Sequence, residues 1–108
     1  MSYSDLRTVQ VVKLPAEIKA ALDSIAADES INLASVIDQA ILWFLEFRAK
    51  PSGYFFYYAP GSNSKEYPVW VQDEVLEKAR LLANKDKQSM RAVLYTAIAR
   101  YLVHQKKI

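Results

Sequence analysis

A shift of 57 residues lays the second half of the chain over the first half without a gap. The apolar positions of the two halves coincide: Val12 falls on Val69, Ile18 on Val75, Val36 on Val93, and Ile41 on Ile98. Asn32 falls on Ser89, so a residue able to cap a helix stands at the same place in both halves. Any two helix pairs align on hydrophobic period, but here strand, helix, cap and second helix share one offset. We therefore interpret the chain as two copies of one supersecondary unit.

Each copy combines a strand with two helices. Residues 8–14, TVQVVKL, are β-branched and apolar and stop at Pro15, which is typical of a short strand. Apolar residues then recur at helical spacing from Ile18 to Ile25, and a second apolar helix follows Asn32. We predict a single compact domain over 1–108, with a first unit at 7–47, a linker at 48–64 and a second unit at 65–105.

The predicted linker carries five consecutive aromatic residues, Tyr54 to Tyr58, before a turn-forming run. Such rings can form a stacking platform for bases. The preferred interpretation is an extra strand or a hydrophobic strap, because a β-hairpin with residues 65–71 is sterically reasonable.

Composition argues against several classes of protein. With 52% apolar and 24% charged residues the chain has a globular composition. It has no cysteine and only one histidine, His104, so we expect no metal centre and no cofactor. The sequence contains no glycine-rich phosphate loop and no nucleophile motif, so we expect neither an enzyme nor a small-molecule substrate. No apolar run is long enough to span a membrane and the N-terminus does not resemble a signal peptide, so we expect a cytoplasmic protein.

The charge of the chain is distributed unevenly. The net charge of +2 is too small to indicate a nucleic-acid partner by itself. Residues 1–56 carry five basic and seven acidic side chains, a balance of −2, whereas residues 57–108 carry nine and five, a balance of +4. The second half is therefore the basic half.

The strand, the helix after a proline, the cap and the second helix together resemble the ribbon-helix-helix family of DNA-binding proteins. The segments TVQVVKLPAEI and ASVIDQAI carry most of the resemblance in the first half, and WVQDEV and AVLYTAI carry it more weakly in the second. The resemblance implies a mainly α fold with a short antiparallel β-ribbon, a tandem ribbon-helix-helix (β-α-α, linker, β-α-α).

The same resemblance implies a function. In that family the ribbon enters the major groove of double-stranded DNA, so the chain is expected to be a sequence-specific transcriptional regulator of a plasmid, virus or other mobile element. A relaxosome or partition accessory protein has the same sequence features. From a different class, a helical protein-interaction module remains open, with the aromatic linker, Trp43 and Trp70 as its partner surface.

The first strand supplies the predicted base contacts. Counting back from Pro15 as the family pattern does puts Lys13, Val11 and Val9 outward, an unusually apolar face. A bulge at Val11 or Val12 lets Thr8, Gln10 and Lys13 share one face, and we predict these three as the base-contacting residues. Arg7 is predicted to contact a flanking phosphate.

Further phosphate contacts are expected where the second helices begin. Asn32 and Ser89 precede helix N-termini, whose N–H groups and positive dipole ends suit phosphates, although ordinary capping explains both residues as well. The full set of predicted phosphate contacts is Arg7, Asn32, Lys87, Ser89 and Arg91. Self-association on tandem sites is expected, because one ribbon reads only a few base pairs.

The second strand is the weaker reader in this hypothesis. In register with the first strand it presents Glu66, Pro68 and Trp70, and a glutamate beside phosphates is unfavourable. Two pairings remain open at this point: the second strand pairs with the first, which we prefer, or it pairs with Tyr54 to Tyr58.

Overall fold

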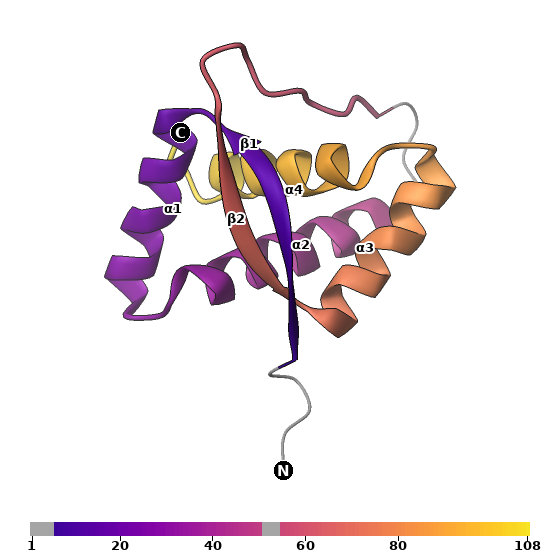
Figure 1. Cartoon of the computed structure of the whole chain (residues 1–108), viewed down its shortest axis with the longest axis horizontal. Coiled ribbons are helices and arrows are strands. Elements are labelled where there is room, and N and C mark those ends of the chain that lie inside the picture. Colours follow the sequence, from indigo (N-terminus) through magenta and orange to yellow (C-terminus); the bar gives the residue numbers. More distant parts are fainter. Residues whose placement is uncertain (1–5, 51–54) are drawn as a thin grey trace.

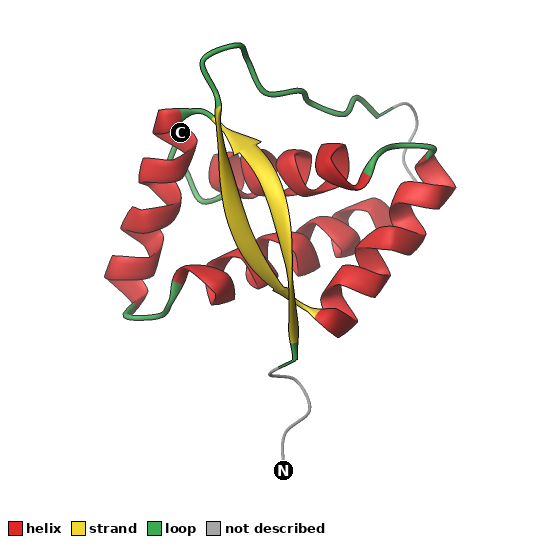
Figure 2. Ribbon diagram, in the orientation of Figure 1, coloured by secondary structure: helices red, strands yellow, loops and turns green. Residues whose placement is uncertain are grey.

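The computed structural model describes residues 6–50 and 55–108. Four helices and two strands follow one another in the order β-α-α-β-α-α (Figures 1 and 2). Their bounds are β1 (Arg7–Leu14), α1 (Ala16–Glu29), α2 (Leu33–Ala49), β2 (Lys65–Gln72), α3 (Asp73–Asp86) and α4 (Met90–His104).

The two strands form one antiparallel sheet that covers one side of the helices. β1 pairs with β2 along its whole length, from Arg7 opposite Gln72 to Leu14 opposite Lys65. The inward side chains of the sheet are buried: Val12, Leu14, Val69 and Val71. In Figure 1 the sheet lies in front of α2 and α4, with α1 and α3 on either side of it. The pairing of the second strand with the first, which we preferred, is confirmed.

The backbone repeats at the offset found in the sequence. Val11 and Pro68, which are 57 residues apart, are cross-strand partners near the middle of the sheet. Ser30 and Lys87, also 57 residues apart, end α1 and α3 in the left-handed conformation with φ of 55° and 57°. Each of these two residues donates its backbone N–H to carbonyls of the preceding helical turn. A tandem β-α-α repeat is therefore consistent with this structure.

One hydrophobic core joins the two halves. The largest fully buried side chains come from every element except α3: Leu14, Leu22, Ile37, Ile41, Phe44, Val71, Leu94, Ile98 and Leu102 are among them. α2 and α4 pack against each other at its centre. Because neither pair of helices could bury its apolar faces alone, each half supplies the surface that the other half covers.

The aromatic segment between the halves acts as a strap. Residues 55–61 contain no strand, so the predicted extra strand is wrong for this described part, and Tyr54 lies outside the described residues. Phe55 packs on Phe44 and Phe47 with ring centroids 5.6 and 6.0 Å apart. The backbone N–H of Tyr58 donates to Thr96 Oγ1 at 2.9 Å, which attaches the strap to α4.

The predicted fold class requires correction. The sequence predicted a short ribbon and a tandem ribbon-helix-helix arrangement with a linker beginning at residue 48. Instead both strands have eight residues, all of them paired, and α2 continues through Ala49 into the predicted linker. The sequence predicted that the first unit ends at residue 47. Apolar residues continue towards the end of α2, and their packing extends the helix past that residue. The fold is four helices with a two-stranded antiparallel sheet, in the order β-α-α-β-α-α.

Within the described residues, no single helix has both the length and the apolar composition to cross a membrane. α1 and α2 meet those criteria only as a pair, and the chain bends by 106° between them.

Candidate nucleic-acid interface

The outward face of the sheet follows from its one-to-one register. β1 lacks the predicted bulge, so its side chains alternate between the two faces of the sheet. Val9, Val11 and Lys13 therefore point away from the helices. Thr8 and Gln10 lie on the opposite face with Val12. The predicted grouping of Thr8 and Gln10 with Lys13 on one face is therefore wrong. The buried positions of Val12 and Leu14 fix the phase of the strand, because a one-residue shift exposes both side chains.

Thr8 and Gln10 take positions at the inner side of the sheet. The Thr8 hydroxyl donates to Asp73 Oδ1 at 2.7 Å, which connects β1 to the first turn of α3. Gln10 is half-buried opposite Val69. Neither residue accompanies Lys13 on the outward face.

The side chain of Arg7 is partly buried and is paired within the protein. Its Nη1 donates to Asp38 Oδ2 at 2.8 Å and to the backbone oxygen of Trp70 at 3.2 Å. Asp38 is buried in α2 and also accepts from the backbone N–H of Gln72 at 3.2 Å. The predicted phosphate contact at Arg7 is replaced by an ion pair that ties the start of β1 and the end of β2 to α2. No local pattern pointed to this pair, because its members are 31 residues apart.

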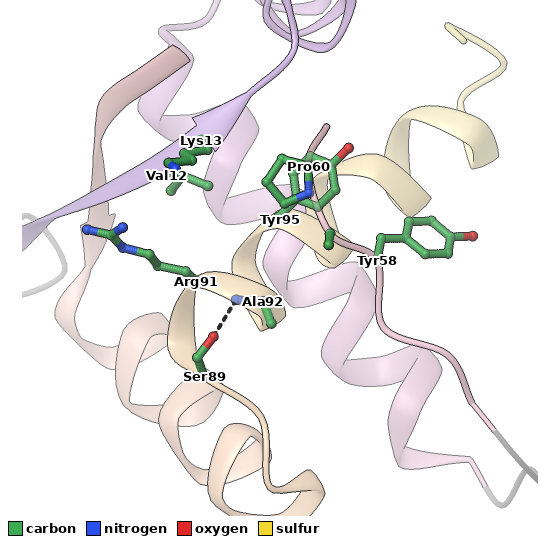
Figure 3. Close-up of a pocket in the computed structure, with 9 residues that line it drawn as sticks. Val12, Lys13, Tyr58, Pro60, Ser89, Arg91, Ala92 and Tyr95 are labelled. Carbon is green, nitrogen blue, oxygen red and sulfur yellow. Dashed lines mark hydrogen bonds between the residues drawn. The ribbon is translucent and has the colours of Figure 1, made fainter. Parts of the chain in front are cut away.

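Three of the predicted residues meet at one end of the sheet. Lys13, Ser89 and Arg91 line a cleft of about 270 Å³ whose other wall is formed by Tyr58 and Pro60 of the strap. Figure 3 shows Lys13 on β1 and Arg91 on the first turn of α4. Within the described residues no hydrogen bond or ion pair engages the side chain of Lys13 or Arg91. We call Lys13, Ser89 and Arg91 the α4 edge.

Both predicted helix caps are confirmed. Ser89 Oγ accepts from the backbone N–H of Ala92 at 3.1 Å, as Figure 3 shows, and Asn32 Oδ1 accepts from the backbone N–H of Ser35 at 2.8 Å. Lys87 is exposed in the turn between α3 and α4, two residues before Ser89. Positive charge therefore gathers where α4 begins, at Lys87 and at the α4 edge.

The start of α2 has a different character. At the 57-residue offset, Trp70 takes the place of Lys13 and Ala34 takes the place of Arg91. We call Asn32, Ala34 and Trp70 the α2 edge. It has the cap but neither of the two cations.

An ion-pair cluster fixes the strap that walls the cleft. Arg48 Nη2 lies 3.1 Å from Asp86 Oδ2, and the Tyr57 hydroxyl donates to the same oxygen. Burial and the hydrogen bond to Asp86 raise the pKa of Tyr57 to about 12. Burial alone favours a higher pKa at Asp86, but the hydrogen bonds from Tyr57 and Arg48 outweigh it and lower the pKa of that carboxyl below its ordinary value. Sequence reasoning missed this cluster, which joins α2, the strap and α3.

The described residues contain no group of histidine, aspartate and glutamate side chains that could hold a metal ion. His104 stacks on Trp43 with ring centroids 4.9 Å apart. Comparison of the chain with family models, with curated proteins and with solved structures finds no match.

Proposed function

We propose that this chain is a sequence-specific double-stranded DNA-binding transcriptional regulator that inserts its two-stranded sheet into the major groove. The observation that carries the proposal is the α4 edge, where two cations with no partner among the described residues flank the end of an exposed antiparallel sheet. The sequence resemblance to ribbon-helix-helix proteins supports the same function.

The dimensions of the sheet agree with this role. A two-stranded ribbon fits a major groove about 12 Å wide, and its outward side chains then reach the base edges. The α4 edge lies where the sheet ends beside the start of α4. Lys13 and Arg91 would there neutralise phosphates, and Ser89 would fix the start of α4 beside them.

Several finer features of the proposal come from the sequence. A source in a plasmid, virus or other mobile element follows from the resemblance, and self-association on tandem sites follows from the few base pairs that one ribbon reads. A cytoplasmic location and a role without catalysis are proposed from the sequence patterns. A relaxosome or partition accessory protein would use the same interface.

A second candidate, a protein-interaction module, is favoured by one observation. Three large apolar side chains on the outward face of the sheet are exposed: Val9, Val11 and Trp70. Exposed apolar clusters of this kind commonly mark protein interfaces.

Salt dependence separates the two candidates. Binding to a random-sequence 20-base-pair duplex is measured by fluorescence anisotropy between low and moderate salt for the wild type and for the double variant Lys13→Ala/Arg91→Ala. The matched control is Lys78→Ala/Arg80→Ala, which removes one exposed lysine and one exposed arginine from α3. All three folds are checked by circular dichroism.

The DNA proposal predicts a steep loss of wild-type affinity with salt. The α4-edge variant should bind weakly, and its slope of log affinity against log salt should be smaller by about 2, because each of the two removed cations neutralises one phosphate. The control should keep the wild-type slope. If the wild type does not bind duplex DNA at low salt, the protein-interaction module replaces the proposal.

A further inference from the structure

The outward face of the sheet is apolar in the middle of the two strands. Val9 stands opposite Trp70, and Val11 stands opposite Pro68. Val9, Val11 and Trp70 are 41%, 37% and 53% exposed, so the described residues leave more than a third of each one open to solvent. We call Val9, Val11, Pro68 and Trp70 the apolar rungs.

The rungs on either side of the apolar rungs are polar. Lys13 stands opposite Glu66 at one end, and Arg7 stands opposite Gln72 at the other. The Arg7 side chain is already engaged with Asp38. A ligand of the outward face therefore meets apolar groups in the middle and, at one end, the charged pair of Lys13 and Glu66.

We infer that the apolar rungs recognise the C5-methyl groups of thymine in the major groove, so that the protein prefers thymine-rich duplex DNA. This inference rests on the proposed DNA-binding function and deepens it.

The chemistry of the groove supports this choice of ligand. Each base pair shows donors and acceptors in the major groove, but only thymine adds a methyl group. Apolar side chains can contact that methyl, whereas against guanine and cytosine they would cover polar atoms without replacing their hydrogen bonds to water. Apolar rungs therefore both favour thymine and disfavour G·C pairs.

The spacing also agrees. Val9 and Val11 are two residues apart on one strand, or about 6.8 Å. Successive base pairs rise by about 3.4 Å, so the two valines span about two base-pair steps. Two neighbouring rungs could thus contact methyl groups within one short site.

A second copy of the chain is the competing occupant. A stable protein interface buries about 800 Å² on each partner. The apolar rungs occupy only the middle of a sheet that is two strands wide, with Lys13 and Glu66 directly beside them. A groove that admits two strands matches this narrow surface better than a flat partner does, and the positive α4 edge complements phosphates.

The test removes the methyl groups from the DNA and leaves the protein unchanged. Binding of the wild type is compared between a 20-base-pair alternating A/T duplex and the same duplex with deoxyuridine in place of thymidine. We expect the removal of methyl groups to weaken binding by roughly fourfold for each methyl that the protein touches. A second comparison uses an alternating G/C duplex with cytosine or with 5-methylcytosine, which restores a methyl at the same position, and we expect the methylated duplex to bind more tightly.

A variant then assigns the effect to the apolar rungs. Val9→Ser/Val11→Ser should discriminate less between the two A/T duplexes than the wild type does, because two of the four apolar rungs are removed while the α4 edge is unchanged. Val103→Ser is the matched control, since Val103 is 54% exposed on α4, and it should discriminate as the wild type does. The comparison of duplexes with the wild type does not depend on the folding of any variant.

The outcomes separate the inference from the function on which it rests. Binding to DNA that is indifferent to methyl groups would overturn the inference and leave the proposed function standing. No binding to any duplex at low salt would overturn both. If sedimentation shows a dimer of the wild type that Val9→Ser/Val11→Ser converts to a monomer, the apolar rungs are an interface between copies and the inference is wrong.

Discussion

The α2 edge and the α4 edge occupy equivalent places in the repeated backbone, but the charged side chains at the two edges differ in their partners. At the α2 edge, the nearby cation Arg7 is bound to buried Asp38 at 2.8 Å. At the 57-residue offset these two positions hold Ser64 and Tyr95, which cannot form an ion pair. The cations of the α4 edge, Lys13 and Arg91, instead line an open cleft.

This difference teaches how one scaffold can separate stability from binding. A cation that is bound to a carboxylate inside the protein is not available to an external phosphate. The α4 edge takes Lys13 from the first half and Ser89 and Arg91 from the second, and its two cations have no carboxylate partner among the described residues. A set of variants at equivalent positions can test this division of roles.

The largest expected effect is loss of stability at Asp38. Asp38→Ala removes the carboxylate that pairs with the half-buried Arg7 and that accepts from the backbone N–H of Gln72. Breaking such a pair costs about 3 kcal/mol. Urea unfolding followed by circular dichroism measures this loss as a lower midpoint.

Asp28→Ala is the control for removal of a carboxylate from the first half. Asp28 forms an exposed pair with Lys107 at 3.3 Å, and exposed pairs contribute less than about 1 kcal/mol. Equal midpoints for the two variants would contradict the structural role of the pair of Arg7 and Asp38.

The next effect compares the ends of the first helices. Asp86 ends α3 in the cluster with Arg48 and Tyr57, whereas Glu29, its counterpart at the 57-residue offset, is exposed. Asp86→Asn should lower stability at neutral pH by about 2 kcal/mol, and Glu29→Gln should leave it unchanged.

The pH dependence of stability should identify the Asp86 cluster. Because folding lowers the pKa of Asp86, its contribution is present above the ordinary carboxyl pKa and is lost as the pH falls through the lowered value. The D86N variant should therefore lose less stability than the wild type as the pH falls through this range. Folding raises the pKa of Tyr57 to about 12, so its contribution is present below about pH 10 and is lost as the pH rises towards 12. If the wild type and D86N lose the same amount of stability as the pH falls, Asp86 does not contribute to the pH dependence of stability.

The repeat could be predicted from the sequence because its signals are local and periodic. Apolar residues at Ile18 and Leu22 mark a helix face within one segment, and Asn32 and Ser89 mark helix starts by residue type. Local signals did not determine which face of the first strand points outward. The polar residues Thr8 and Gln10 suggested that their face does, but Val12 lies on the same face and is buried, so that face points inward.

The contacts that organise the candidate site could not be predicted in this way. The pair of Arg7 and Asp38 and the cluster around Asp86 join residues that are 31 and 38 apart in sequence. Hydrophobic period gives each helix a buried face but does not say which polar residue of another element will lie beside it. The cleft at Arg91 likewise depends on where the strap crosses α4.

A charge placed at each helix start sharpens the comparison of the two edges. Ser89→Asp and Asn32→Asp both keep a good capping residue and both add one negative charge. Stability should change little in either variant. Affinity for random-sequence duplex DNA should fall roughly tenfold for Ser89→Asp, because the carboxylate would repel a phosphate at the α4 edge. It should change less than about twofold for Asn32→Asp; an equal fall at both positions would mean that both edges contact phosphates.

The smallest effect is a gain in stability at Ser64, the counterpart of Arg7. The Ser64 hydroxyl is buried and has no hydrogen-bond partner among the described residues, so the folded chain bears the cost of removing it from water. Ser64→Ala should therefore raise stability by up to about 1 kcal/mol, whereas Ser62→Ala, in the exposed turn nearby, should have no measurable effect. Urea midpoints at unchanged slope measure both changes. A loss of stability at Ser64 would show that its hydroxyl has a partner, and the second half would then hold a polar contact in the place that Arg7 and Asp38 fill in the first.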